Sequence, residues 1–320
     1  MPLITYSRSI AEAMLQMFFL GAVGFFLMRK KAISPEGLTG LTRFLIEVTM
    51  PALIFCSIIN KFNFKDYSNW WQFTLLGFAT TGLGLGIGYF LTRSEKDPVL
   101  KKEFISLLGF QNSGYLPLVI ISWIVAKEQL SAMLIYLFMF VVGFDLLIWS
   151  WGVYFLSCHK SKHFSFGSVF TPPIIATLTG FAFIILKINA FIPKFIFSPL
   201  TMLGNCSFPL AIVVVGASLA DLYVNKKMNK KLIFRLVSAK LILMPLIGLA
   251  LVSYIKLPYL LGLLIVMELA VPSATNLAVI VRRYIGEETF ISQGIFVTHL
   301  LSLLTLPLFL AAFNWIVFHQ

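Results

Sequence analysis

Apolar runs follow one another along almost the whole chain, separated only by short polar loops. A helix of roughly 20 residues is long enough to cross the hydrocarbon core of a bilayer, and most of the runs reach that length. With 59% hydrophobic and 12% charged residues and a mean hydropathy of +0.91, the chain has more apolar surface than one soluble core can bury. We therefore expect an all-α polytopic membrane protein.

The runs predict ten membrane-spanning helices. They cover residues 9–28, 41–59, 71–92, 104–125, 131–156, 171–186, 196–220, 232–255, 258–280 and 289–317. The first run is not a cleaved signal peptide, because Arg29, Lys30 and Lys31 follow it instead of preceding it.

Basic residues are divided unevenly between the two sides of the membrane. The loops after the odd-numbered spans hold seventeen lysines and arginines, whereas the opposite side holds seven. The positive-inside rule places the richer side in the cytoplasm, so both termini are expected to be extracytoplasmic. Topology thus accounts for the net charge of +12, and no nucleic-acid partner is expected.

The fourth span is interrupted at Gln111–Pro117. Gly114 loosens a helix, Pro117 removes a backbone donor, and Asn112 and Ser113 place polar groups at the membrane midplane. One interpretation is a kinked helix whose asparagine bonds a neighbouring helix. The other is a discontinuous helix that forms a substrate site, since broken backbone is tolerated at this depth only within protein or beside a wet cavity.

The two halves of the chain show matching features. The segment Glu47–Phe55 around Pro51 resembles Asn205–Val213 around Pro209, and both prolines are expected to break their helices. The ninth span is broken at Val271–Asn276, as the fourth is at Gln111–Pro117. Both correspondences step by five spans, an odd number, so the second half must be inverted relative to the first.

This correspondence predicts two inverted five-helix repeats with broken crossover helices 4 and 9. The first repeat covers residues 1–157, a short cytoplasmic connector covers 158–170, and the second repeat covers 171–320. Interrupted spans at matching positions in inverted halves favour a transporter binding site.

The orientation of the broken spans indicates the charge of the ligand. The outer half of span 4 should begin near Pro117 and the inner half of span 9 near Pro272, because proline suits the first turn of a helix. Two positive helix ends with unpaired backbone N–H groups would then meet, an arrangement that favours an anion such as a carboxylate. The substrate-binding residues are predicted to be Asn112, Ser113, Gly114, Tyr115, Pro117, Pro272, Ser273 and Asn276.

Four other polar residues are candidates for coupling to H⁺ or Na⁺. Asp145 and Glu268 lie close to the midplane, where an unpaired charge costs at least about 2.5–3.5 kcal/mol, so each either couples ions or makes a structural hydrogen bond. His299 suits a proton relay, with helix packing as its alternative. Glu47 either faces the cavity or caps the helix break at Pro51.

Two further features are interpreted as structural. Lys240 is expected to extend its ammonium group to the cytoplasmic face. The glycines of span 3 lack the Lys-Ser/Thr of a phosphate loop and are expected to allow close helix packing; they are Gly82, Gly84, Gly86 and Gly88.

Cysteine and histidine provide no further chemistry. Cys56, Cys158 and Cys206 form no disulfide framework or metal spacing, and the four histidines form no catalytic constellation. We therefore expect no enzyme activity, no metal and no cofactor.

Four motifs in order resemble the auxin efflux carrier family, and the likeness extends through nearly the whole chain. They are Pro51–Phe55, Asn112–Pro117, Pro272–Asn276 with Arg283–Gly286, and Thr298–Pro307. The resemblance implies ten helices in two inverted repeats that cross at the substrate site, with Asn112, Pro117, Pro272 and Asn276 at the crossover.

The resemblance also implies a scaffold of spans 1, 2, 6 and 7, which often forms the dimer contact, and a mobile domain of spans 3–5 and 8–10. The chain lacks the long central cytoplasmic loop of the plant members and is similar to short microbial permeases for malate- or malonate-like acids, related to the bile acid/sodium symporter superfamily.

The expected function is secondary active transport of a small organic anion by an elevator-type alternating-access motion. The protein would be embedded in the lipid of the plasma (inner) membrane as a homodimer. Two alternatives stay open: a sodium-coupled symporter of the bile-acid type, and a membrane sensor that binds its ligand without moving it.

Overall fold

The computed structural model describes residues 3–62, 69–157, 170–221, 228–255, 257–284 and 289–319, and within this part the chain is helical. The helices in order are α1 (Leu3–Arg29), α2 (Pro35–Phe44), η1 (Leu45–Thr49), α3 (Met50–Lys61), α4 (Trp70–Leu91), α5 (Pro98–Gly109), α6 (Tyr115–Ile124), α7 (Lys127–Leu147), η2 (Ile148–Gly152), α8 (Val153–Ser157), α9 (Pro172–Ile185), η4 (Ile188–Phe191), α10 (Lys194–Asn205), α11 (Ser207–Asp221), α12 (Lys230–Ser238), η5 (Ala239–Leu243), α13 (Met244–Tyr254), α14 (Tyr259–Ala270), α15 (Asn276–Tyr284) and α16 (Thr289–His319).

Many of these helices are long and apolar enough to cross a membrane. Within the described residues there are six, at Pro35–Asn60, Trp70–Leu91, Lys127–Leu156, Lys194–Asp221, Lys230–Tyr254 and Phe290–Val317. Shorter apolar helices cover Phe18–Arg29, Tyr115–Ile124, Pro172–Ile185 and Tyr259–Ala270. The expectation of an all-α membrane protein is confirmed; the ten-span inverted repeat stays a prediction.

Local capping explains why two helices begin earlier than the apolar runs. The Ser34 hydroxyl accepts a hydrogen bond from the Gly37 amide at 3.1 Å, and a proline follows the cap, so α2 begins before the expected residue 41. The Asp97 carboxylate caps α5 in the same way, with Pro98 at the first helical position. Hydropathy alone does not locate these starts, because caps are polar.

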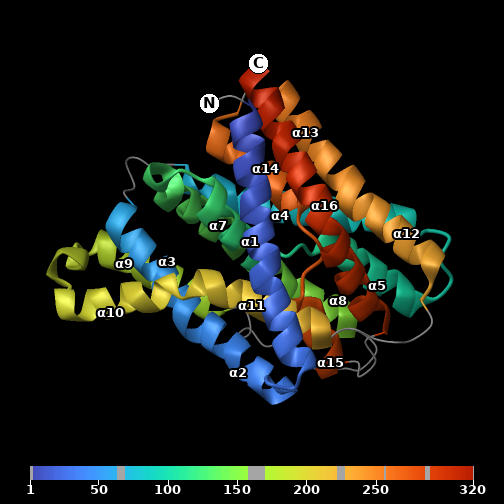
Figure 1. Cartoon of the computed structure of the whole chain (residues 1–320), viewed down its shortest axis with the longest axis horizontal. Helices are drawn as coiled ribbons and strands as arrows, with labels where there is room; N and C mark the ends of the chain where they lie inside the picture. Colours follow the sequence, from blue (N-terminus) through green and yellow to red (C-terminus); the bar gives the residue numbers. More distant parts are fainter. Residues whose placement is uncertain are drawn as a thin grey trace.

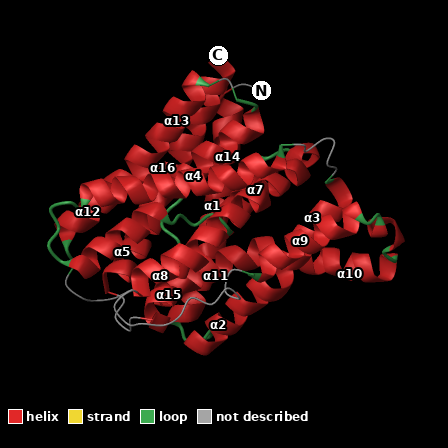
Figure 2. Cartoon of the chain, turned by 180° about the vertical axis from the view of Figure 1, so that it is seen from behind, coloured by secondary structure: helices red, strands yellow, loops and turns green. Residues whose placement is uncertain are grey.

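The helices pack into two bundles (Figures 1 and 2). The first bundle consists of α1, α2, α3, α9, α10 and α11, with α1 on α11 and α3 against both α9 and α10. The second bundle consists of α4–α8 and α12–α16, with α4 on α5 and α7 and α14 on α13 and α16. The bundles meet where α6 packs on α11, α16 on α1, and α3 on α7.

The two ends of the chain lie at the same end of the molecule. Figures 1 and 2 both show the start of α1 beside the end of α16. Most of the connector predicted at residues 158–170 lies outside the described residues, and its membrane side stays a prediction.

Glycines allow the closest helix contacts. A Cβ on Gly84 would lie 2.8 Å from the Leu108 carbonyl oxygen, and one on Gly88 would lie 3.0 Å from the Ile105 Cα, so these glycines pack α4 against α5 as expected. Gly82 and Gly86 face open space, so the packing role expected of them is wrong. Gly82 and Gly86 lie on the side of α4 opposite Gly84 and Gly88. The spacing of the four glycines divides them between two faces of the helix but does not show which face packs against α5.

Candidate functional site

The two interrupted helices meet at their non-helical segments. The Asn112 amide donates to the Pro272 carbonyl oxygen at 2.8 Å, and the Ala274 amide donates to the Phe110 carbonyl oxygen at 2.9 Å. These bonds form an antiparallel bridge between Gln111 and Ser273. The breaks between α5 and α6 and between α14 and α15 therefore lie side by side, and their backbone groups satisfy one another away from water.

The second break follows from the effect of a proline on the residue before it. Val271 precedes Pro272 and is extended, with φ −69° and ψ 151°, as a residue before proline prefers. Pro272 thus ends α14, and α15 begins only at Asn276. The half-helix was expected to begin near Pro272 with the proline in its first turn; this placement of the proline is wrong, because the proline acts on the residue before it and α15 begins four residues later. Pro117 does lie in the first turn of α6.

The negative end of α5 has its own donors. The Ser273 hydroxyl donates to the Leu107 carbonyl oxygen at 2.7 Å, and the Lys240 ammonium donates to the Leu108 carbonyl oxygen at 2.9 Å. Lys240 is fully buried, so the expectation that it reaches the cytoplasmic face is wrong. The exposed carbonyls at a broken helix end carry partial negative charge and supply the partner that a buried cation requires.

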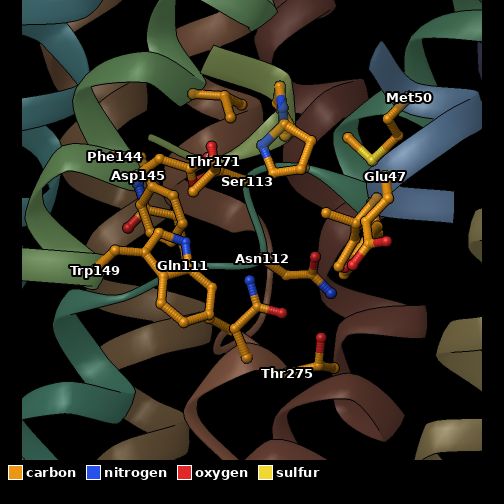
Figure 3. A pocket seen from close by; sticks show the side chains of 18 of the residues that line it. Glu47, Met50, Gln111, Asn112, Ser113, Phe144, Asp145, Trp149, Thr171 and Thr275 are labelled. Atoms are coloured by element: carbon orange, nitrogen blue, oxygen red, sulfur yellow. The ribbon is translucent and has the colours of Figure 1, made fainter. Parts of the chain in front are cut away.

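A cavity of about 520 Å³ lies beside the crossover, between the two bundles. The first bundle and the segment before α9 contribute Ile46, Glu47, Met50, Phe170, Thr171, Pro172 and Pro173 to its wall. The second bundle contributes Gln111, Asn112, Ser113, Gly114, Tyr115, Val141, Phe144, Asp145, Trp149, Ala274, Thr275 and Asn276. We call this cavity the crossover pocket (Figure 3).

Both positive helix ends of the crossover line this pocket. Gly114 and Tyr115 begin α6, and Thr275 and Asn276 begin α15. Amides in the first turn of a helix have no acceptor within that helix, and the helix dipole is positive there. Because the negative end of α5 is occupied by Ser273 and Lys240, the pocket faces the ends that suit an anion.

Two acids also line the crossover pocket. The Asp145 carboxylate accepts a hydrogen bond from the Thr171 hydroxyl at 3.1 Å, and the Trp149 side chain lies near it. Glu47 is exposed to the pocket. Figure 3 shows Glu47 and Asp145 on opposite walls with Asn112 between them. The pocket thus offers carboxylates as well as helix amides, so a bound anion would lie near groups that favour protons or cations.

Glu268 lies in a different environment. It is fully buried in α14 and is not among the described residues that line the crossover pocket. It interacts electrostatically with Lys240, and the Ser113 hydroxyl lies near it. Neither of its carboxylate oxygens reaches hydrogen-bonding geometry with a described group. Glu268 and Lys240 therefore lie buried near each other behind the crossover, and the described partner of the Lys240 ammonium is the Leu108 carbonyl oxygen.

His299 of α16 connects directly to the crossover. Its Nε2 lies 3.0 Å from the side-chain Nδ2 of Asn112, and its Nδ1 lies 2.9 Å from the Ile295 carbonyl oxygen. Sequence reasoning named both Asn112 and His299 but not their contact, because they lie 187 residues apart.

The structure places the predicted substrate residues in two sets. Those that line the pocket are Asn112, Ser113, Gly114, Tyr115 and Asn276, whereas Pro117, Pro272 and Ser273 are not among its described lining residues. Substrate binding by these residues stays a prediction. Sequence reasoning missed Gln111, Trp149, Thr171 and Thr275. Trp149 lies one turn after Asp145 and Thr275 lies within the second break, so their positions carried a signal, whereas nothing marked Thr171.

The prolines of the first bundle behave differently from each other. At Pro51 the helix is continuous and changes from the π-helix η1 to α3, so the helix break expected at Pro51 is wrong: the proline lies in the first turn of α3, where its missing donor is tolerated. Near Pro209 the chain turns at Cys206 between α10 and α11, so Pro209 lies in the first turn of the new helix.

Comparison with known proteins identifies the family of the chain. The family model described as membrane transport protein matches residues 9–165 and 158–310. No curated protein matched the chain. The chain therefore belongs to the membrane transport protein family, the auxin efflux carrier family, whose members are membrane transporters and not enzymes.

Proposed function

We propose that this transporter moves a small organic anion, a carboxylate, through the crossover pocket. The observation that carries the proposal is that two helix N-termini, at Gly114–Tyr115 and Thr275–Asn276, both line the pocket. Their dipoles and amides attract negative charge without a metal or a basic side chain. A volume of about 520 Å³ is within the range of small-molecule sites.

The mechanism we propose is alternating access by displacement of one bundle relative to the other. The pocket lies at the boundary between the bundles, with Glu47 and Met50 on one side and Asn112 and Asn276 on the other. The first bundle would act as the scaffold and the second as the mobile domain. This proposal includes ten spans in two inverted repeats, a homodimer in the plasma membrane, and both termini outside the cytoplasm.

Coupling to a proton is part of the proposal. An ionised Asp145 or Glu47 in the pocket repels a carboxylate, so protonation of one of them on binding would remove that repulsion. Sodium coupling, with the same carboxylates as cation ligands, is the second candidate, because the described lining contains acids and no Lys or Arg.

The test is uptake into liposomes containing the purified protein. Labelled short carboxylates should enter saturably, whereas the matching primary amides should not. Asn112→Ala and Asn276→Ala should each lower uptake about tenfold or more while the protein stays folded in detergent, since a pocket group is lost and not a core contact.

The proposal fails if amides and carboxylates enter alike, or if no carboxylate is taken up by folded wild-type protein. If the alanine variants unfold but retain uptake per folded molecule, the two asparagines are structural and the pocket has another role.

A further inference from the structure

A second cavity, of about 330 Å³, lies between four helices. Helices α1 and α11 of the first bundle form one side of it, and α6 and α16 of the second bundle form the other (Figure 1). The described residues that line it include none of those that line the crossover pocket. We call this separate space the lateral cavity.

The wall of the lateral cavity is apolar, and the polar side chains in its described part already have partners. These polar side chains are His299 and Ser302. The Ser302 hydroxyl donates to the His299 carbonyl oxygen at 2.7 Å, and the two ring nitrogens of His299 face Ile295 and Asn112. A hydrophilic ligand would therefore lose its hydration without gaining hydrogen bonds from these side chains.

The lateral cavity extends from the buried interior to the surface of the molecule. Ile212 and Leu306 are buried in its wall, whereas Phe18, Phe26 and Leu300 are each more than half exposed. The exposed residues belong to α1 and α16, which are apolar along this part of their length. In a membrane the exposed apolar side of such a helix faces acyl chains, so the cavity opens toward lipid.

An acyl chain fits the space and the chemistry of the cavity. An apolar cavity of roughly 150 Å³ stays dry and accepts a benzene molecule, so a cavity of about 330 Å³ has room for several methylene groups. A lipid chain gains no hydrophobic free energy on entry, because it leaves hydrocarbon for hydrocarbon. It does gain the dispersion contacts that the lining of an empty cavity lacks.

We propose that the lateral cavity binds one acyl chain of a bilayer phospholipid, which enters from the membrane between α1 and α16. A phospholipid keeps its headgroup at the membrane surface, whereas a free fatty acid drawn into the cavity would need a partner for its carboxylate that the described wall does not offer. The inference depends on the membrane location of the chain and not on the substrate proposed above.

The experiment asks whether a lipid chain reaches the buried wall of the cavity. Purified protein is placed in phosphatidylcholine liposomes that contain a phosphatidylcholine with a photoreactive diazirine in one acyl chain, and the labelled residues are mapped after illumination. Lipid around the protein reaches outward residues such as Leu308, which is 68% exposed. Wild type should carry labels on Ile212 and Leu306 as well, although they are 3% and 1% exposed.

Two neighbouring positions on α16 provide a test variant and its matched control. Leu303 lines the cavity, so Leu303→Trp should fill the space and remove the labels from Ile212 and Leu306. Leu304 is 70% exposed and is not among the described lining residues, so Leu304→Trp should retain those labels. Labelling of Leu308 should persist in both variants and serves as the internal reference.

A second pair of variants on α1 repeats the test from the opposite wall if Leu303→Trp does not fold. Ala22 lines the cavity and its neighbour Val23 does not belong to the described lining. Ala22→Phe should therefore remove the labels from the buried wall, and Val23→Phe should retain them. Size-exclusion chromatography in detergent establishes that each variant is folded.

The bound chain contacts both bundles, so it should also stabilise their contact. Addition of phosphatidylcholine to the protein in detergent should raise the midpoint of thermal unfolding of wild type and Leu304→Trp by about 2–4 °C more than that of Leu303→Trp. Equal shifts in all three proteins would contradict a chain held between the bundles.

The labelling outcomes decide the proposal. Labels on outward residues alone would mean that the cavity is closed to lipid or filled by another protein segment, and would overturn it. Labels on Ile212 and Leu306 that persist in both Leu303→Trp and Ala22→Phe would also overturn it, since the lipid would then reach them by another route. Labelling of the buried wall by a diazirine fatty acid but not by the phospholipid would assign the cavity to a free fatty acid and contradict the choice of phospholipid.

Discussion

Asp145 and Glu268 are both acids of the membrane interior, but they face different partners. Asp145 lines the crossover pocket and accepts from Thr171, whereas Glu268 is sealed behind the crossover near Lys240. A charge on Asp145 acts on a bound anion directly. Glu268 is not among the described residues that line the pocket, so we propose Asp145 as the coupling site.

The first prediction concerns pH. Protonation of Asp145 removes a negative charge from the pocket, so uptake of a carboxylate should rise as external pH falls and decline as it rises. Asp145→Asn should flatten this response while retaining exchange of internal for external anion. Glu268→Gln serves as the comparison, because it removes an acid outside the described lining of the pocket.

If uptake by Glu268→Gln no longer varies with pH while uptake by Asp145→Asn still does, the coupling residue is Glu268 and not Asp145. Wild-type uptake that is flat in pH but steep in sodium would make the carboxylates cation ligands instead.

Individual residues also show what sequence could and could not reveal. Asn112 and Asn276 were located because a polar residue within a few positions of Gly or Pro in an apolar run is costly in lipid unless it serves a helix break or a site. The buried hydrogen bond of Lys240 was not predicted, because its acceptor, the Leu108 carbonyl oxygen, lies 132 residues away. The depth of a residue in a span does not identify its partner. The contact between Asn112 and His299 was hidden for the same reason.

At the scale of helices, the contact between α1 and α11 has almost no space between the backbones. A Cβ on Gly216 would lie 1.9 Å from the Gly21 carbonyl oxygen, and one on Gly24 would lie 2.1 Å from the Val213 carbonyl oxygen. Backbones approach this closely in membranes where small residues line the contact. The pair α1–α11 is thus the tightest described contact of the first bundle, which suits a scaffold.

The second prediction uses one substitution at two glycines. Gly216→Ala should destabilise the protein by about 1–3 kcal/mol, because the added methyl group forces the helices apart. Gly86→Ala is the matched control, since its methyl group meets open space and alanine favours helix over glycine. Thermal unfolding in detergent measures both. Equal midpoints for the two variants would show that the close approach of α1 and α11 does not limit stability.

Most helix boundaries followed from sequence to within a few residues, but α1 begins six residues before the expected residue 9, and polar caps or prolines shift others. Asp97 and Ser34 extend their helices beyond the apolar runs, and Pro272 ends α14 instead of lying in the first turn of α15. Hydropathy reports burial in lipid, whereas these residues act on backbone hydrogen bonds.

For the whole molecule, the orientation in the membrane depends on the loop charges. The third prediction is that a cysteine at Ser7 reacts with a membrane-impermeant reagent in intact cells, whereas one at Lys227 reacts only after the membrane is opened. The seventeen-to-seven division of basic residues is the reason. Labelling of the position 227 cysteine from outside would invert the topology and exchange the inner and outer halves of both broken helices.

The arrangement of the two bundles could not be read from hydropathy, because lipid-facing and protein-facing apolar helices have the same composition. The sequence did predict that the two helix breaks lie together, because their matching positions in the two halves of the chain indicated one shared site. Glu47 and Thr171 line the same pocket because α9 packs beside η1, a contact between helices that hydropathy does not predict.

The most direct test of transport through the crossover pocket is a cysteine at Thr275, in a protein whose Cys56, Cys158 and Cys206 are replaced by serine. Thr275 lines the pocket at the start of α15, so its accessibility reports which side the pocket faces. In liposomes with the protein in one orientation, we predict that a membrane-impermeant thiol reagent labels Thr275→Cys from either side, and that a transported carboxylate slows labelling from both. Labelling from one side only, unaffected by any anion that the protein carries, would contradict an alternating pocket at the crossover.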